Sequence, residues 1–284
     1  MRASVAGSMI GLAAMVVGCG STQPATAPPT ARDELASVAF EDPQAQTFAG
    51  ARAQLVRRCM AERGFTLPTA SPAPSIPTAD TPPSGAGYGL FAQFANAERP
   101  RADATEPGFR RALMGSARQT GTLHLRDGAI VTYRTSGCYA HAMATLYGSV
   151  RHYQWLVFTR NTVRGTAGER LARDPRLAGA LTGWTRCMRM RGFPYPSPEA
   201  ARQDVYDAYM EDSDRARARR RELAIAAADR YCAERTGIYP ELARAQHDAV
   251  RRMSSDERAA AVAIARSRAT ALNRARRIVT TSPG

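Results

Sequence analysis

Lysine is absent from the sequence, and arginine supplies all 39 basic residues. A chain without lysine cannot carry a Ser-x-x-Lys motif, and we find no Gly-x-Ser-x-Gly, no His-Glu-x-x-His and no phosphate-binding glycine loop. The cell-wall enzymes that depend on those motifs are therefore disfavoured. A hydrolase that needs only two well-placed carboxylates has no sequence signature, so that class stays open.

Long hydrophobic runs are also lacking. The run from Val5 to Val17 has about 13 residues, too few to cross a bilayer of about 30 Å as a helix. Because Arg2 precedes it and Gly18-Cys19 follows it, residues 1–18 are typical of a lipoprotein signal peptide. By resemblance to bacterial lipoboxes, Cys19 would carry a diacyl anchor and become the new N-terminus. An ordinary secretory signal is the alternative, and both would export the protein.

The composition after the leader is that of a globular protein. The chain has 284 residues, of which 44% are hydrophobic and 23% charged, which excludes a disordered, collagenous or coiled-coil protein. Residues 19–36 contain several prolines and few large side chains, so we expect the lipidated cysteine to be followed by a flexible tether. We divide the remainder into halves, 37–165 and 166–284.

Four cysteines remain after Cys19, which fits two disulfides in an oxidising compartment. Four cysteines allow three connectivities, and an internal repeat favours one of them. The segment Arg-Cys-Met-x-x-x-Gly-Phe occurs around Cys59 and again around Cys187, each time as the predicted last turn of a helix. A later helix carries the next cysteine in each case. We therefore expect Cys59 to pair with Cys138 and Cys187 with Cys232.

Helical patterns dominate the rest of the chain. Periodicity and capping residues predict helices over 106–119, from Ser136 to about 161, from Asp174 to 192, over 198–210 and 213–235, from Pro240 to Met253, and from the capping box Ser254–Glu257 toward 277. Residues 122–133 are predicted as two short strands joined at Asp127-Gly128. The predicted fold is mainly α, a disulfide-stapled helical bundle with one small β-hairpin.

Several of these segments resemble uncharacterised lipoproteins of high-GC actinobacteria. The matching segments are Ala112–Gly115, the Asp127-Gly128 hairpin, Gly137-Cys138, Trp184–Met188 with Gly192-Phe193, and Ala227–Cys232. The resemblance covers most of the mature chain and implies a lipid-anchored location and this disulfide pattern, but no activity. The lack of lysine fits such an origin because arginine codons are rich in G and C.

The formal net charge of +14 suggests anionic partners. We expect membrane lipid, through the anchor on Cys19, and an envelope protein or an anionic wall polymer, but no nucleic acid. Two arginine runs, 215–221 and 274–277, are candidates for contact with such surfaces. Solvated helix faces are the more ordinary interpretation of these runs.

Reactive centres are sparse. His141 lies one turn after Cys138 and would form a metal pair or an activated thiol only if that cysteine were unpaired. Met188 and Met190 near Cys187 could indicate a soft-metal site, but packing in the core is the preferred interpretation. Acidic residues over 204–214 lack the pattern of a calcium loop and would pair with the following arginines. His152 and His247 form no dyad with their neighbours. We predict neither a catalytic residue nor a metal or cofactor.

Three functional hypotheses follow. The first is a non-enzymatic interaction or scaffold lipoprotein on the extracellular face of the cell membrane. The second is an extracytoplasmic binding protein for a small ligand or wall polymer, which predicts a concave pocket where Tyr139, Tyr147, Tyr153 and Trp155 meet arginines. The third is a carboxylate-dependent wall hydrolase, which predicts two close carboxylates in a cleft.

Overall fold

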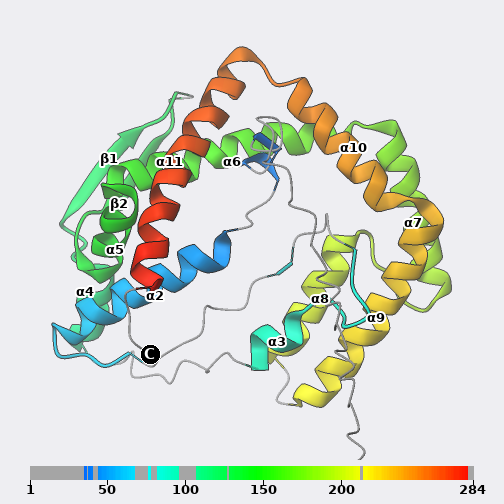
Figure 1. The fold of residues 1–284 in the computed structure, drawn as a ribbon, viewed down its shortest axis with the longest axis horizontal. Coiled ribbons are helices and arrows are strands. Elements are labelled where there is room, and N and C mark those ends of the chain that lie inside the picture. Colours follow the sequence, from blue (N-terminus) through cyan, green and yellow to red (C-terminus); the bar gives the residue numbers. More distant parts are fainter. Residues whose placement is uncertain are drawn as a thin grey trace, which may run out of the picture.

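The computed structural model describes residues 35–280, apart from 37, 41–43, 68–75, 78–81, 96–106, 127 and 212–213. The predicted signal peptide, Cys19 and nearly all of the predicted tether lie outside the described residues. The described part is mainly helical with a single two-stranded sheet, as predicted (Figure 1). No helix in it combines the length and the hydrophobicity needed to span a bilayer.

The elements follow one another with short connections after residue 107. They are α2 (Ala45–Ala61), α3 (Leu90–Ala95), α4 (Pro107–Met114), β1 (Thr120–His124), β2 (Ile130–Arg134), α5 (Gly137–Tyr147), α6 (Val150–Ala172), α7 (Pro175–Met190), α8 (Pro198–Glu211), α9 (Arg215–Thr236), α10 (Ile238–Arg251) and α11 (Ser255–Thr280).

Several helix ends lie where the capping residues predicted them. The Asp174 carboxylate accepts hydrogen bonds from the first backbone N–H groups of α7. At the start of α11, the Ser254 N–H donates to Glu257 at 2.7 Å and the Glu257 N–H donates to the Ser254 hydroxyl at 3.2 Å. This reciprocal pair is the predicted capping box.

The hairpin is also confirmed. Strands β1 and β2 are antiparallel, and Gly121 lies opposite Tyr133 in the register. Gly128, in the connection, has a φ of 85°, which favours glycine. Its predicted turn partner Asp127 lies outside the described residues.

The single helix predicted from Ser136 to about 161 is wrong, because the chain breaks after Tyr147. Gly148 ends α5 with a φ of 88° and donates its N–H to the Ala144 carbonyl. The Ser149 hydroxyl then caps α6 by accepting from the His152 N–H at 3.0 Å. A glycine that stops one helix directly precedes a serine that starts the next, and these end signals outweigh the continuous apolar periodicity.

The helix predicted over 106–119 is shorter than expected, since α4 ends at Met114. Gly115 has a φ of 77°, and a Cβ there would lie 2.1 Å from the Ser136 carbonyl oxygen. This close approach brings the end of α4 against the start of α5. The prediction that the Ser136 side chain caps α5 is wrong. Its hydroxyl instead accepts a hydrogen bond from the Ser116 N–H.

The internal repeat forms two equivalent helix ends. The Phe65 N–H donates to the Met60 carbonyl at 3.0 Å, and the Phe193 N–H donates to the Met188 carbonyl at 2.9 Å. Both disulfides have the predicted pairing, Cys59 with Cys138 and Cys187 with Cys232. Each bond therefore joins the end of the repeat helix to a later helix, α5 in one case and α9 in the other.

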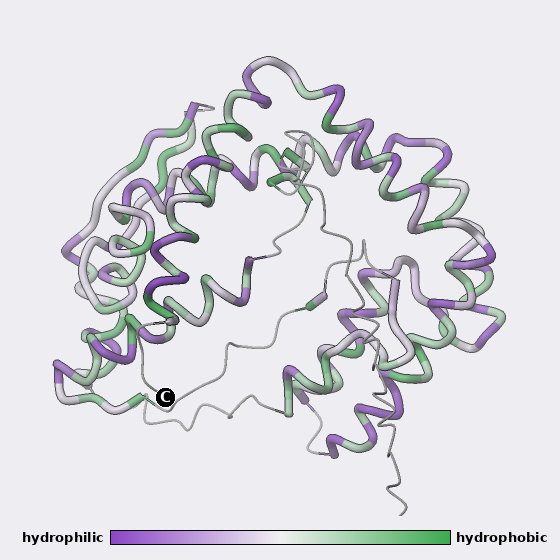
Figure 2. The backbone as a smooth tube through the Cα atoms, in the orientation of Figure 1, coloured by the Kyte–Doolittle hydropathy of each residue, from purple (hydrophilic) through white to green (hydrophobic). Residues whose placement is uncertain are grey.

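We divide the helices into two groups that contact each other through α6, α7 and α10. We call the group of α2, α4, β1, β2, α5, α6 and α11 the first unit, and the group of α3, α7, α8, α9 and α10 the second unit. The expected boundary at 165/166 lies within α6, and α11 returns from the far end of the sequence to pack on α2, α5 and α6 (Figure 1). Apolar residues recur along the helices of both units (Figure 2).

Candidate functional site

A network of buried polar side chains occupies the centre of the second unit. Asp229 is fully buried and accepts hydrogen bonds from the Tyr88 hydroxyl and Trp184 Nε1, each at 2.9 Å, and from the Tyr239 hydroxyl. The Arg202 guanidinium, 1% exposed, lies 3.9 Å from Asp229 and donates to Tyr239. Burial and the neighbouring Asp229 raise the pKa of the Tyr88 phenol far above its usual value, so it remains a donor.

A second buried carboxylate attaches α3 to this unit. Glu222 accepts from the backbone N–H groups of Leu90 and Phe91 at the start of α3, and from the Tyr209 hydroxyl at 2.7 Å. The Arg219 guanidinium lies 2.9 Å from the same carboxylate. With their donors arranged around them, Glu222 and Asp229 act as internal acceptors that hold five elements together, and neither lines a described cavity.

The residues that the sequence offered as a reactive thiol or as metal ligands do not come together in one site. Cys138 is disulfide-bonded and fully buried while His141 is exposed, so the activated thiol or metal pair is ruled out. Met188 is buried in the core next to Trp184, whereas Met190 is 76% exposed. Within the described residues, no three side chains of the metal-binding types come together.

The acidic stretch before α9 has the structural roles that the sequence suggested. Asp204 accepts two hydrogen bonds from Arg221, at 2.9 and 3.0 Å, and one from the Tyr195 hydroxyl. Asp214 caps α9. The arginine run 215–221 is consequently engaged in part with the second unit itself, through ion pairs to Asp204 and Glu222.

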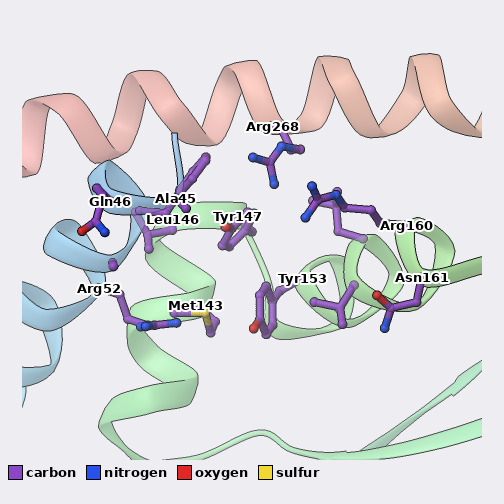
Figure 3. A pocket seen from close by; sticks show the side chains of 14 residues that line it. Ala45, Gln46, Arg52, Met143, Leu146, Tyr147, Tyr153, Arg160, Asn161 and Arg268 are labelled. Carbon is purple, nitrogen blue, oxygen red and sulfur yellow. The ribbon is translucent and has the colours of Figure 1, made fainter. Parts of the chain in front are cut away.

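A cavity of about 350 Å³ lies in the first unit between α2, α5, α6 and α11 (Figure 3). Its apolar wall is formed by Phe48, Met143, Leu146, Leu156 and Val157. The volume is at the lower end of the range of about 300–1,000 Å³ found for small-molecule sites. An apolar hollow of this size accommodates the hydrocarbon or aromatic part of a small ligand.

Three arginines from three helices border this cavity. Arg52 comes from α2, Arg160 from α6 and Arg268 from α11, and their side chains approach the space from different sides (Figure 3). All three are partly buried. The Arg160 Nε donates to the Val38 carbonyl at 3.0 Å, and the Arg268 guanidinium lies over the Phe48 ring at 5.2 Å. No described residue of the lining is a carboxylate, so the three positive charges share one partly desolvated space.

Two of the four tyrosine and tryptophan residues named from the sequence line the same cavity. Tyr147 and Tyr153 pack against each other with ring centroids 5.1 Å apart. Tyr139 supports them from behind, with its hydroxyl 3.3 Å from that of Tyr153. Burial, followed by this hydrogen bond, raises the pKa of the Tyr153 phenol far above its usual value. Trp155 does not line the cavity but stacks on His152.

Sequence reasoning missed the three arginines, although a signal for them exists. In α11 the residues Ala261, Ile264, Ala271 and Ala275 are buried at helical spacing, and Arg268 lies on the same stripe between them. Arg52 falls in the same way between Phe48, Leu55 and Cys59 of α2, and Arg160 between Leu156, Val163 and Ala167 of α6. A charged residue on an apolar stripe indicates a functional or paired position.

A second, smaller opening lies between α6, α8 and α10 and includes Arg164, Glu199 and Gln246. It holds one carboxylate among its described lining residues. Neither cavity therefore brings together the two carboxylates that the hydrolase hypothesis requires.

Searches against protein-family models, curated proteins and solved structures found no match for this chain. The resemblance to actinobacterial lipoproteins therefore stays a prediction from the sequence. The candidate site rests on the geometry of the cavity alone.

Proposed function

We propose that this protein is an exported, lipid-anchored binding protein for a small organic anion, which it holds in the cavity of the first unit. The observation that carries the proposal is the convergence of Arg52, Arg160 and Arg268 on an apolar hollow lined by Tyr147 and Tyr153. The binding-protein hypothesis had specified a pocket of this kind, where tyrosines meet arginines. The lipid anchor on Cys19 and the extracellular location are part of the proposal.

The chemistry of the lining defines the ligand class. Guanidinium groups bind carboxylates, sulfonates and phosphates through charge-assisted hydrogen bonds, which are strong where water is partly excluded. The aromatic and aliphatic wall favours an apolar body attached to the anionic group. An amphipathic anion matches both the guanidinium groups and the apolar wall of the site, whereas a neutral compound matches only the wall.

The test uses two probes that share one ring system. We expect 8-anilinonaphthalene-1-sulfonate to bind saturably with a stoichiometry of one, as measured by fluorescence titration. N-phenyl-1-naphthylamine lacks only the sulfonate and should bind at least about tenfold more weakly, because it makes no charge-assisted hydrogen bond. Equal affinity for the two probes would contradict a site built for anions.

Matched variants locate the binding site. Arg268→Gln and Arg52→Gln should each weaken sulfonate binding about tenfold. Arg266→Gln removes the same charge from an exposed position two residues away on α11 and should change it less than twofold. If Arg266→Gln weakened binding as much as Arg268→Gln, the probe would be responding to net charge and the cavity assignment would be wrong.

The scaffold hypothesis has no comparable feature in its favour. It predicts a stoichiometric partner that mild crosslinking in native membranes would recover, and it stays a prediction.

A further inference from the structure

Charge is distributed very unevenly along the chain. The middle segment, residues 169–257, contains 17 arginines and 15 acidic residues. The two outer segments, residues 1–168 and 258–284, contain 22 arginines and ten acidic residues. The outer segments form most of the first unit, so the positive charge of the protein is concentrated there.

The middle segment neutralises its arginines internally. Arg221 pairs with Asp204 at 2.8 Å, and Arg244 pairs with Asp174 at 2.7 Å. The outer segments have no comparable supply of carboxylates among their described residues. A surface with an excess of cations attracts anions from outside.

Six of these arginines belong to neighbouring segments of the first unit, namely the end of α2, the helix α4, the loop after it and the end of β2, which Arg63 and Arg134 join by hydrogen bonds to the end of α4. We call this group the basic end. All six are exposed: Arg58, Arg63, Arg110, Arg111, Arg118 and Arg134.

Backbone hydrogen bonds and a disulfide hold the basic end in shape. Arg63 donates to the Ala112 carbonyl at 3.2 Å, and Arg134 donates to the Gly115 carbonyl at 3.2 Å. Cys59–Cys138 lies directly beneath, in a small core with Met60 and Ala112. These contacts fix the position of the arginines without removing their charge.

We infer that the basic end is a docking surface for the anionic phospholipid headgroups of the membrane that carries the protein. Met114, at the end of α4, is 42% exposed among these arginines. A bilayer offers phosphates to the guanidinium groups and an apolar layer to Met114, whereas a soluble phosphate polymer offers only the first.

The predicted anchor limits how far the folded part lies from the membrane. Cys19 precedes Leu35 by 16 residues, a length that spans at most about 55 Å. Leu35 and Val38 are buried against residues of α6, α10 and α11, so the chain enters the molecule where the two units meet. This argument shares the lipid anchor with the proposed function, but it does not use the cavity.

The experiment measures vesicle binding without the anchor. The chain from residue 19 onward, with Cys19→Ser, is sedimented with vesicles of phosphatidylcholine alone or with about one third phosphatidylglycerol. We expect binding only to the anionic vesicles and release in 0.5 M salt, where screening is strong. Equal binding to both vesicle types, or none to either, would overturn the inference.

Two triple variants remove equal charge from different places. Arg110→Gln, Arg111→Gln and Arg118→Gln together should weaken binding to anionic vesicles on the order of a hundredfold, from about fivefold per arginine. The control changes the exposed Arg186, Arg189 and Arg220 of the second unit to glutamine and should weaken it less than threefold. Similar losses in both variants would mean that net charge, and not the basic end, determines binding.

Two further measurements separate this inference from its alternatives. Met114→Ser should weaken vesicle binding several-fold but leave binding to polyphosphate unchanged; the reverse result would assign the surface to a polymer and overturn the inference. Arg268→Gln, which tests the cavity, should bind vesicles as the wild type does. If the protein bound vesicles but not the sulfonate probe, the docking surface would be supported and the cavity proposal would fail. If it bound the probe but not vesicles, the cavity would be supported and the docking surface would fail.

Discussion

The charged side chains inside the two units have different surroundings. In the second unit, the fully buried Asp229 and Glu222 are surrounded by hydroxyl, indole, guanidinium and backbone donors. In the first unit, three partly buried arginines border a cavity that has no carboxylate among its described lining residues. The carboxylates of the second unit are enclosed by donors, whereas the arginines of the first unit border a cavity.

This difference separates a structural role from a binding role. Buried carboxylates that accept several hydrogen bonds from different helices specify one packing of those helices. Cations on the wall of an apolar hollow lie where a ligand that enters it comes into contact with them. The carboxylates of the second unit therefore stabilise the fold, while the arginines of the first unit line a cavity.

The largest expected effect on stability comes from removing a buried carboxylate from the second unit. Asp229→Ala leaves the buried Arg202 without its carboxylate and three donors without an acceptor, so we expect a loss of about 3–5 kcal/mol in the free energy of unfolding, measured by urea denaturation. Asp207→Ala, on the partly exposed side of α8, should cost less than about 0.5 kcal/mol. A loss below about 1 kcal/mol for Asp229→Ala would mean that the network does not stabilise the unit.

A smaller effect tests whether the two units are stabilised separately. Replacing Cys59 and Cys138 by serine, or Cys187 and Cys232, removes a loop closure over 79 or 45 residues and should cost about 2–4 kcal/mol in each case. Hydrogen exchange should show the lost protection in α2 and α5 for the first pair and in α7 and α9 for the second. Equal loss of protection in both units for either pair would show one cooperative unit instead of two.

The smallest effect concerns acid. A hydrogen bond from Arg244 lowers the pKa of Asp174. Burial alone would raise the pKa of Glu257, but hydrogen bonds from Arg170 and from the Ser254 backbone lower it below its usual value. A pKa lower in the folded than in the unfolded state contributes stability that is complete above about pH 5 and is lost as the pH falls through the folded value. The effect is modest because Glu257 and the arginine partners of both carboxylates are partly exposed and screened by solvent.

Both groups belong to the middle segment, so its protection against hydrogen exchange should fall between pH 5 and pH 3 while that of α2 and α5 changes little. Hydrogen exchange at several pH values measures this directly. Earlier loss of protection in α2 and α5 would contradict the charge asymmetry between the middle and outer segments.

Much of the fold was predictable from short stretches of sequence. The caps at Asp174 and Ser254, the hairpin and the repeated helix end each depend on residues a few positions apart, and the structure has all of them. The two errors have local causes as well. Gly148-Ser149 broke a helix that periodicity had predicted to continue, and the close contact at Gly115 ended α4 early. In both cases a glycine conformation outweighed the hydrophobic pattern.

The candidate site was predictable only in part. Tyr147 and Tyr153 stand close together on one predicted helical stretch, so sequence analysis placed them in a binding hypothesis. The stripe positions of Arg52, Arg160 and Arg268 mark each arginine as unusual within its own helix. Nothing in those stripes indicates that the three helices meet, and so the cavity could not be predicted.

The sequence by itself predicted most of the helices and their end signals and favoured the observed pairing of the cysteines, because these depend on contacts within one turn or on a repeat that is visible in the chain. Only the tertiary structure decided that α11 returns to α2 and α6. This return brings together Arg52, Arg160 and Arg268, and each is separated from the next by 108 positions in the sequence. Helix pairing depends on the shape and area of whole apolar faces, and many pairings satisfy the same periodicity. The cavity, the basic end and the separation of the two units follow from that choice.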